Sequence, residues 1–389
     1  MEKIRLGIIG IGNIGSDHVK RIVNGECPEI SLGAVCDIKP GRLAWAKQTA
    51  GEETPVFTDA EEMMKSGLID SVLVAVPHYD HPKYAVMSME YGLHVLIEKP
   101  AGVYTKQVIE MNEAAEKSGV VFGIMMNQRT NHIYRKMREI VKSGELGAIR
   151  RTNWIITNWY RPQAYYDSGD WRATWSGEGG GVLLNQCPHN LDLWQWICGM
   201  PEKIYARMHF GKWHDIEVED DVTAYAEYAN GATGVFVTTT GDAPGTNRFE
   251  IDLEKGKLVA EDGKLTMWKS EISEPEFSRG NQKPFGSMRF TKTEVETDGA
   301  NTQHAGVMNA FAAAILHGTP LVADGREGIN GLTISNAMHL SAWTDKAILL
   351  GEMDHELYFS ELMKCVAVSR RKTSVLDAVA DDMGNTFGT

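Results

Sequence analysis

The sequence predicts an α/β fold, in which a doubly wound parallel sheet is followed by an α+β domain with a mainly antiparallel sheet. Over residues 1–126, short β-rich runs alternate with helix-length amphipathic stretches, which is the pattern of βαβ units. After residue 127 the alternation stops and hairpin signals appear. We therefore expect one domain over 1–126 and a second over 127–352, with a C-terminal tail over 353–389 that we assign to neither.

Five runs in the first domain are expected to be strands: IRLGIIG, ISLGAVCD, SVLVAVP, HVLIEKP and VVFGIMM. They are apolar nearly throughout rather than alternating, as expected when helices cover both faces of a sheet. The stretches between them predict helices over 13–24, 41–50, 59–66, 81–91 and 105–117. Glycines stand just past four of these ends, where a left-handed residue closes a helix.

The second domain mixes helices with hairpins. We expect a helix over 131–142, a strand over 149–158, a helix over 184–198, and later helices over 303–316 and 328–349. The runs 221–229 and 232–240 alternate with a period of two around Asn230-Gly231, which is a strong signal for a two-residue hairpin. Further short strands with glycine turns follow, so the sheet of this domain is expected to be antiparallel.

The composition argues against several classes of protein. The formal net charge of −13 repels phosphate backbones and anionic lipid, so we expect neither nucleic acid nor a membrane surface as a partner. No apolar run approaches the ~20 residues of a membrane-spanning helix. Five cysteines without a C-x-x-C pair favour a reducing, cytoplasmic setting.

A metal site is not expected either. His209 and His214 stand near the acidic residues of segment 215–221, but the spacing is loose and the carboxylates are hard ligands. This pattern favours a solvated loop over a metal centre.

The motif GIGNIG at residues 10–15 follows a strand and opens a helix, and Asp37 ends the next strand 22 residues after Gly15. The first glycine permits a tight turn, the second lets backbone amides approach a pyrophosphate, and the third lets helix and strand pack closely. Asp37 is expected to bind the adenosine ribose and to oppose a 2′-phosphate, which favours NAD over NADP. Lys39 and Arg42 lie near enough to soften that preference, and a role as surface charges is equally compatible with their position.

Two further elements point to chemistry. Lys99 ends the fifth strand, in Glu98-Lys99-Pro100, at the sheet edge where ligands of a doubly wound fold bind. The segment 177–199, GEGGGVLLNQCPHNLDLWQWICG, places Asn185 and His189 four residues apart, on one helix face. Its glycine run lets a backbone or a ligand come close to the helix start.

Seven of the ten tryptophans lie between Trp154 and Trp213, and several tyrosines join them. Core packing and a subunit interface account for part of this aromatic stretch. The functional interpretation is a wall of flat faces with polar tips, suited to sugar rings. The expected substrate contacts are Tyr166, Trp171, Arg172, Trp175, Asn185 and His189.

Together these residues resemble the glucose-fructose oxidoreductase and inositol dehydrogenase family, often called Gfo/Idh/MocA, over nearly the whole chain to about residue 350. The resemblance rests on GIGNIG, VAVPHYDHPKYAVMSMEYGLHVLIEKP, SGELGAIR, EGGGVLLNQCPHNLDLWQWICG and ADGREGINGLTISNAMHLSAW. It implies a Rossmann domain joined to an α/β domain whose large open antiparallel sheet makes subunit contacts, hence a homodimer or homotetramer. It also implies a pyridine-nucleotide enzyme that acts on sugars or polyols.

In that family the lysine of EKP and the histidine of the second motif are catalytic, which here selects Lys99 and His189. Many members carry an aspartate four residues before that histidine, whereas this chain has Asn185. An asparagine orients a hydroxyl or holds a histidine tautomer, but it accepts no proton as a carboxylate does. The resemblance therefore leaves the proton relay of this chain open.

The family segment beside the nicotinamide matches Val76, Pro77 and His78, and His81 matches a recurrent histidine at a helix start. The residues expected to bind the cofactor are then Gly10, Gly12, Asn13, Ile14, Gly15, Asp37, Arg42, Val76, Pro77, His78, His81, Glu98 and Lys99.

We thus expect an NAD-dependent enzyme that oxidises a secondary alcohol of a sugar or glycoside, with C3 of a pyranoside as the preferred position. Three alternatives stay open. They are an inositol or polyol dehydrogenase, an enzyme that retains its cofactor and uses transient oxidation, and a regulatory NAD-binding protein without turnover.

Overall fold

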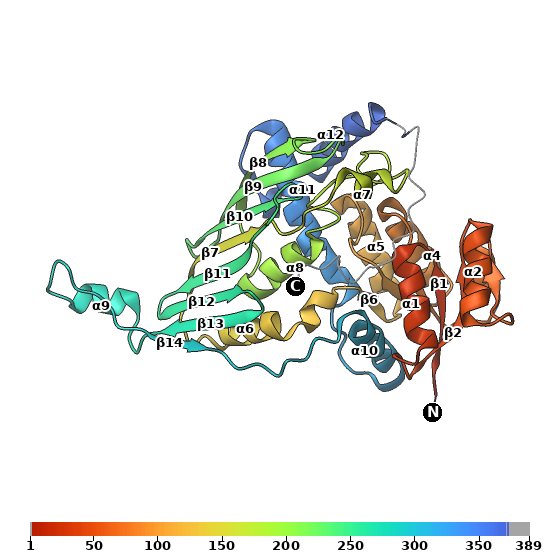
Figure 1. Ribbon diagram of the computed structural model, residues 1–389, viewed down its shortest axis with the longest axis horizontal. Coiled ribbons are helices and arrows are strands. Elements are labelled where there is room, and N and C mark those ends of the chain that lie inside the picture. The colour runs from red at the N-terminus through yellow and green to blue at the C-terminus, as the bar shows by residue number, and fades with distance from the viewer. Residues whose placement is uncertain (1, 371, 373–389) are drawn as a thin grey trace.

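Two β-sheets organise the computed structural model, which describes residues 2–370 and residue 372 (Figure 1). The first is a six-stranded parallel sheet in the order β3-β2-β1-β4-β5-β6. The second has nine strands in the order β14-β13-β12-β11-β7-β10-β9-β8-β15. Its neighbours are antiparallel except for the parallel pair β7 and β10. The predicted fold class is therefore confirmed.

The N-terminal sheet contains one strand that the sequence pattern did not reveal. Its elements are β1 (Ile4–Ile9), α1 (Asn13–Val23), β2 (Ile30–Cys36), α2 (Pro40–Ala50), β3 (Val56–Phe57), α3 (Ala60–Lys65), β4 (Ser71–Val74), α4 (His81–Glu90), β5 (His94–Ile97), α5 (Thr105–Ser118) and β6 (Phe122–Ile124). The missed strand is β3, which has only two residues and therefore no periodicity to detect.

The second half is built on longer strands. Its elements are α6 (His132–Ser143), β7 (Ile149–Ile156), α7 (Gln163–Asp167), α8 (Pro188–Cys198), β8 (Lys203–Phe210), β9 (Glu219–Glu227), β10 (Thr233–Thr239), β11 (Asn247–Leu253), β12 (Gly256–Glu261), β13 (Lys264–Lys269), α9 (Glu274–Gly280), β14 (Thr291–Glu294), α10 (Gln303–His317), α11 (Gly328–Thr344), β15 (Ile348–Leu349) and α12 (His355–Ala367). The hairpin expected at Asn230-Gly231 joins β9 to β10. Among these helices, none combines the length and apolar character that a bilayer crossing requires.

The structure differs clearly from the expected elements in three places. The helix expected over 184–198 begins only at Pro188, because proline is favoured in the first turn, where its missing N–H is not needed. The helix expected over 328–349 ends at Thr344, and the chain then enters β15. Part of the expected tail forms α12, which packs on α5 and α11. Residue 371 and residues 373–389 of that segment lie outside the described residues.

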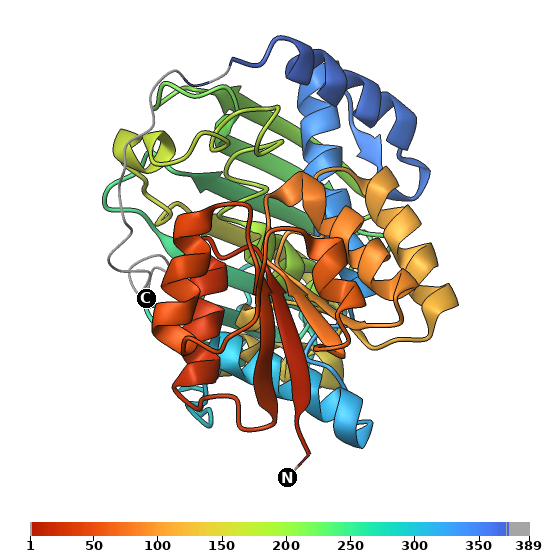
Figure 2. The same ribbon diagram turned by 90° about the vertical axis from the view of Figure 1, so that its right-hand side faces the viewer.

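Helix α10 packs on the first sheet rather than on the second. Its side chains Val307, Met308 and Phe311 are buried in one core cluster with residues of β1, α1 and α2. Grouping this helix with the second domain was therefore wrong, because its apolar face covers the side of the parallel sheet where α1 and α2 lie (Figure 2). The other side of that sheet is covered by α4 and α5.

The nine-stranded sheet is covered by helices on one face. Along β7, β9 and β10, buried residues alternate with more exposed ones, which is the pattern of a sheet with a single packed face. The packed face holds Trp154, which stacks on Phe249 at 4.1 Å between ring centroids, and α11 lies against β8. Helix α8 lies between α6 and α11 in the same layer.

A buried ion pair ties α11 to the start of β9 and to the glycine run. His339 Nε2 lies 3.0 Å from Glu219 Oε2, and both side chains are almost fully buried. Glu219 also accepts hydrogen bonds from the backbone amides of Gly181, at 2.8 Å, and Leu183, at 3.0 Å. Burial opposes a charge on His339, but the Glu219 carboxylate outweighs it and raises the pKa of the imidazole. This pair therefore fixes the segment that leads into α8.

The same pair predicts how stability varies with pH. Because the folded-state pKa of His339 is raised, the pair stabilises the protein fully below the unfolded pKa of about 6.5. That contribution is lost as the pH rises through the folded-state pKa. We expect His339→Gln to lower the free energy of unfolding by about 3 kcal/mol at low pH, measured by urea denaturation, and to flatten its pH profile above pH ~6.5.

The exposed His317, which pairs with Glu29 at the surface, is the matched control. His317→Gln is expected to change the free energy of unfolding by less than about 0.5 kcal/mol. A His339→Gln profile parallel to that of the wild type at every pH would contradict the role assigned to the pair.

Candidate active site

The glycine loop at residues 10–15 has the geometry that a dinucleotide requires. Gly10 adopts φ +89°, and a Cβ there would lie 2.5 Å from the carbonyl oxygen of Ala75. A Cβ on Gly15 would collide with the carbonyl of Gly10, so both glycines are needed for helix α1 to lie close to the sheet. Gly12 is different, because a Cβ there would meet no atom within 4 Å. The open side of the loop thus lies at Gly12, at the positive N-terminus of α1.

Asp37 is held against this loop. One carboxylate oxygen accepts the backbone N–H of Ile11 at 2.7 Å and the other accepts that of Lys39 at 2.8 Å. The next residue, Ile38, is 80% exposed. An oriented carboxylate beside an exposed apolar side chain suits a ribose and its attached base, so the residues present fit an adenine dinucleotide. Arg42 is partly exposed in the first turn of α2, and its expected cofactor contact stays a prediction.

The end of β5 carries a buried network. Glu98 is 4% exposed and its Oε1 lies 2.7 Å from His18 Nε2. Burial alone would raise the pKa of Glu98, but the hydrogen bond and charge of His18, together with His304, lower it to about 2. Burial in the same cluster lowers the pKa of His304 to about 4. Glu98 is thus buried and paired with His18, and its expected contact with the cofactor stays a prediction.

His81 is likewise a supporting residue. It is 1% exposed, and its two ring nitrogens lie 2.7 and 2.8 Å from the carbonyl oxygens of Pro100 and Val76. Both nitrogens thus lie against the main chain, and the expected contact of His81 with the cofactor stays a prediction. It joins the loop after β4, which contains Val76 and Pro77, to the loop after β5.

His78 links this region to the second domain. Its Nδ1 lies 3.3 Å from the carbonyl oxygen of Glu178, and its ring meets Trp171 edge-on at 5.4 Å between centroids. Burial lowers the pKa of His78 well below its usual value, so the ring is neutral near pH 7. The contact of His78 with the cofactor, and those of Val76 and Pro77, stay predictions.

Lys99 crosses to the second domain. Its Nζ donates a hydrogen bond of 3.0 Å to the carbonyl oxygen of Asn185. Burial lowers the pKa of Lys99, while the carboxylates of Glu98 and Glu178 act in the opposite direction. His189, four residues after Asn185 and in the first turn of α8, is 3% exposed. Burial and the positive charge of Lys99 hold its pKa well below 6.5. The structure thus brings Lys99, Asn185 and His189 into one neighbourhood.

Helix α8 is anchored by Asp192, another residue of the segment 177–199. Asp192, one turn after His189, forms a bidentate ion pair with Arg129 at 2.8 and 2.7 Å. Both side chains are 2% exposed, and Arg129 lies just after β6, where the chain passes from one sheet to the other. A guanidinium and a carboxylate in this geometry hold orientation as well as position. This pair therefore fixes α8, and with it His189, relative to the first sheet.

The glycine run 179–181 is required by close backbone packing. A Cβ on Gly179 would collide with the side chain of Val103 in the first domain, and one on Gly181 would collide with the carbonyl of Glu219 in the second. Gly179 also has φ +81°, which favours glycine. Of the two interpretations that the sequence left open, approach of another backbone is the one that the packing supports.

The aromatic stretch divides into buried core residues and a partly exposed rim, which includes Trp171 and Arg172. Tyr166 is 3% exposed and donates to Thr240 Oγ1 at 2.7 Å, and Trp175 is 6% exposed in a cluster with Trp343. Both side chains are used in packing, and their expected substrate contacts stay predictions. Trp171 and Arg172 remain partly exposed, and the guanidinium lies 4.7 Å from the Trp171 ring centroid.

Tyr165, one of the tyrosines of the aromatic stretch, and Glu178, to which the sequence assigned no role, join this rim. The Tyr165 hydroxyl accepts from Arg172 Nη1 at 2.9 Å, and both Asn185 Nδ2 and Gln186 Nε2 lie within 3.3 Å of it. Glu178 accepts a hydrogen bond from Asn185 Nδ2. No local sequence pattern indicates these contacts, because only the fold brings the side chains together.

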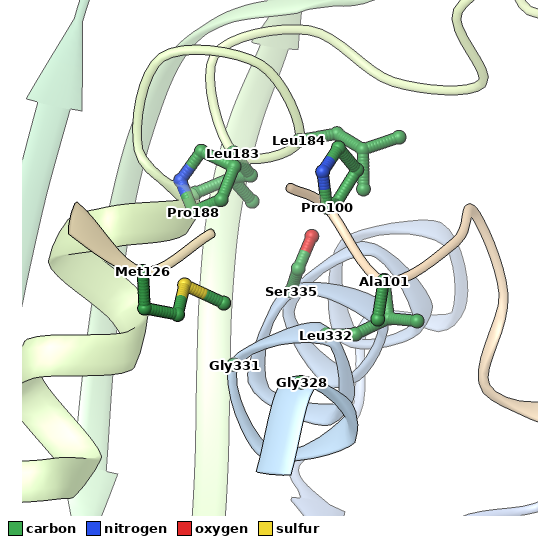
Figure 3. Close-up of a pocket in the computed structure, with 10 residues that line it drawn as sticks. All are labelled: Pro100, Ala101, Met126, Leu183, Leu184, Pro188, Gly328, Gly331, Leu332 and Ser335. Carbon is green, nitrogen blue, oxygen red and sulfur yellow. The ribbon is translucent and has the colours of Figure 1, made fainter. Parts of the chain in front are cut away.

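An apolar pocket lies beside these groups. Figure 3 shows Pro100 and Ala101 of the loop after β5 facing Leu183, Leu184 and Pro188, with α11 below them. The Met126 side chain and the Ser335 hydroxyl point into the space between. Pro100 follows Lys99 and Pro188 precedes His189, so this apolar seam packs the two candidate catalytic segments against each other.

The residues considered for a metal are used differently. Within residues 2–370 and 372, no group of three or more potential ligands meets. His209 lies 3.1 Å from Asp221, and His214 lies 3.1 Å from Asp220. Asp220 and Glu219 are fully buried, so the expected solvated loop is wrong at these positions. Asp220 accepts from the backbone amides of the turn before it.

The position of Asp37 predicts the cofactor preference. In Asp37→Asn the charge is lost, and an amide has only one oxygen for the two backbone donors. We expect the dissociation constant for NAD to rise about 10-fold or more, measured by calorimetry, and the preference over NADP to shrink. Asp242→Asn, in an exposed loop of the second domain, is the control and should leave NAD affinity unchanged. Equal NAD affinity in both variants would contradict the ribose contact.

Comparison with known proteins agrees with this geometry. A model of an oxidoreductase family with an NAD-binding Rossmann fold matches residues 4–126, and a model of the GFO/IDH/MocA C-terminal domain matches residues 134–259. A myo-inositol 2-dehydrogenase from Thermotoga maritima is 22% identical over 90% of this chain and 99% of its own length. An inositol 2-dehydrogenase from Corynebacterium glutamicum is 26% identical over 51% of this chain and 55% of its own length.

A solved structure shows the same overall arrangement. The WlbA dehydrogenase from Bordetella pertussis, in complex with NADH and UDP-GlcNAcA, is 25% identical, with a TM-score of 0.76 over 91% of this chain and all of that chain. The two matched models together span more than half of the sequence, one on each side of the crossing at residues 127–133. The protein belongs to the Gfo/Idh/MocA family of oxidoreductases, and its N-terminal domain is an NAD-binding Rossmann domain.

Proposed function

We propose that the protein oxidises a secondary alcohol of a sugar or glycoside, with NAD as the hydride acceptor. The observation that carries the proposal is the approach of Lys99 Nζ, from the end of β5, to the carbonyl of Asn185, in the segment that leads to His189. In a doubly wound sheet this is the edge at which the nicotinamide and the substrate meet. A cation and a neutral imidazole at that edge are the two groups that alcohol oxidation needs.

In the proposed mechanism His189 is the general base. Burial keeps its imidazole neutral, so the ring is in the form that accepts the hydroxyl proton. The Lys99 ammonium stabilises the alkoxide that develops as this proton leaves. Bound NAD supplies the acceptor for the hydride from the carbinol carbon. The alcohol thus loses one proton and one hydride and becomes a ketone, and His189 passes its proton to solvent.

The substrate class is argued from the rim. Trp171 offers a partly exposed flat face and Arg172 offers donors, which together suit a sugar ring with its hydroxyls. A pyranoside oxidised at C3 to a 3-keto sugar is our first candidate. A free inositol is the second, because the Thermotoga maritima relative is named a myo-inositol 2-dehydrogenase. A UDP-linked sugar acid is the third, because WlbA was solved with UDP-GlcNAcA.

A substrate panel tests this function. Glucosides, inositols and a UDP-linked sugar acid are each incubated with enzyme and NAD, and NADH formation is followed by absorbance. We expect turnover of a pyranoside, and a loss of kcat of about 10²- to 10⁴-fold in His189→Ala, because a general base contributes that much. His209→Ala, at an exposed histidine, is the control. Normal turnover by His189→Ala, or NAD binding without oxidation of any compound, would overturn the proposal.

We also propose that the protein forms a homodimer or homotetramer through its nine-stranded sheet. The face away from the helices exposes apolar side chains on neighbouring parts of the sheet, with Ile155 41% and Tyr225 43% exposed. Sedimentation at low micromolar concentration is expected to give at least a dimer mass, and a monomer mass would contradict this assignment.

All five cysteines lie in the described part of the chain as free thiols, which is compatible with the expected cytoplasmic location.

A further inference from the structure

We propose that Glu178 is a positioning residue of this site. It holds the side-chain amide of Asn185 in one orientation, so that Oδ1 of that amide accepts a hydrogen bond from the substrate. The inference rests on the proposed alcohol oxidation. It assigns a role to a carboxylate at the start of the second motif, directly before the glycine run, to which the proposed mechanism gives no part.

Glu178 is fixed at the junction of the two domains. Its side chain is buried, with 2% of the residue exposed. Its backbone N–H donates to the carbonyl of Thr174 at 2.9 Å, and its own carbonyl faces His78 Nδ1 in the first domain. The next residue, Gly179, packs so closely on Val103 that it has no room for a side chain. The carboxylate therefore starts from a backbone that is held on both sides.

Both carboxylate oxygens face donors. Oε2 accepts the backbone N–H of Ala173 at 2.5 Å, and Oε1 accepts from Asn185 Nδ2. Burial raises the pKa of Glu178, while the charge of Arg172 and these two hydrogen bonds act to lower it. A carboxylate so completely buried is unfavourable unless its hydrogen bonds are satisfied, and here each oxygen has one. Glu178 thus bridges the loop that carries Arg172 and the segment that carries Asn185.

This bridge determines which way the Asn185 amide points. The Nδ2 group has two hydrogens, and its acceptors are Glu178 Oε1 and the hydroxyl of Tyr165, at 3.3 Å. A flipped amide would set its carbonyl oxygen against a carboxylate, and two acceptors repel each other. Asn185 Oδ1 is therefore held on the side away from Glu178, as the one acceptor that this side chain offers. The main-chain carbonyl of Asn185 already binds Lys99.

The charge of Glu178 also acts on the catalytic lysine. Its carboxylate favours the protonated form of Lys99, against the burial that disfavours it. Besides Glu178, the charges that act on Lys99 are those of Glu98, Arg172 and Arg161. The charges of Arg172 and Glu219 act on Glu178 itself. A neutral residue at position 178 would change the orientation of Asn185 and remove this support for the ammonium.

A reciprocal exchange of acid and amide tests the inference. In Glu178→Gln the new amide has one oxygen for two donors, so either Ala173 or Asn185 loses its partner. In Asn185→Asp a partly buried carboxylate faces the buried carboxylate of Glu178. In the double variant Glu178→Gln/Asn185→Asp, the amide oxygen introduced at position 178 accepts from Ala173, while the NH₂ of the same amide donates to the carboxylate introduced at position 185. The hydrogen bonding is thus restored with donor and acceptor exchanged.

We expect each single variant to lose about 10²-fold in kcat on the alcohol identified by the panel, because a small misplacement of a reacting group has an effect of that size. The double variant should recover at least about tenfold over the poorer single variant. NAD affinity, measured by calorimetry, should equal that of the wild type in all three, since the dinucleotide loop is untouched. Glu217→Gln is the matched control, because Glu217 accepts from Trp175 and Ser369 away from Asn185 and should leave kcat unchanged.

The outcomes separate this inference from the proposed function. Wild-type kcat in Glu178→Gln, or a double variant no better than the poorer single variant, would overturn the role of Glu178 while alcohol oxidation stands. A wild-type enzyme that oxidises no alcohol would remove both. If Glu178→Gln fails to fold, Asn185→Ala removes the proposed acceptor directly, and undiminished kcat in that variant would overturn the inference.

Discussion

The close packing of the segment 177–187 between the two domains is the constraint on which the rest of the site depends. Gly179 is pressed against Val103 of the first domain and Gly181 against the carbonyl of Glu219 in the second. The buried Glu219 carboxylate then holds the amides of this segment while it pairs with His339. A side chain at Gly179 would collide with the first domain and one at Gly181 with the start of β9, so this packing requires a backbone without Cβ atoms at both positions.

The same packing explains the electrostatics. Lys99 and His189 lie in a region where burial lowers the pKa of both. Burial makes a lysine or a histidine easier to neutralise than it is in water. The nearby carboxylates therefore determine whether Lys99 or His189 keeps a charge. Glu98 and Glu178 both favour the protonated lysine, whereas the charge of Lys99 itself disfavours a protonated His189. One cation beside one neutral base is the stable arrangement.

Local patterns predicted the backbone better than they predicted the side chains. The glycine loop, Asp37 and the EKP strand end follow short-range rules, and the fold class was predicted from periodicity. The burial of Tyr166 and Trp175 was not predicted, because an aromatic residue looks the same in sequence whether it lines a rim or fills a core. The two main-chain contacts of His81 were not predicted either, since its carbonyl partners come from different loops. The role of Glu178 and the partners of Tyr165 were not predicted, because these side chains face one another only after folding.

The return of helix α10 to the first sheet limits how the two domains can move. The chain leaves the parallel sheet after β6, builds most of the second sheet, and comes back to cover the face beside α1 and α2 with Val307, Met308 and Phe311. Several segments of the chain therefore join the two halves instead of a single linker. A bending motion about one pivot would have to strain all of them, so entry of a ligand is more easily accommodated by rim loops such as the one carrying Trp171 than by the opening of a hinge. An excised N-terminal fragment ending at residue 126 would leave an apolar face uncovered and would be prone to aggregate.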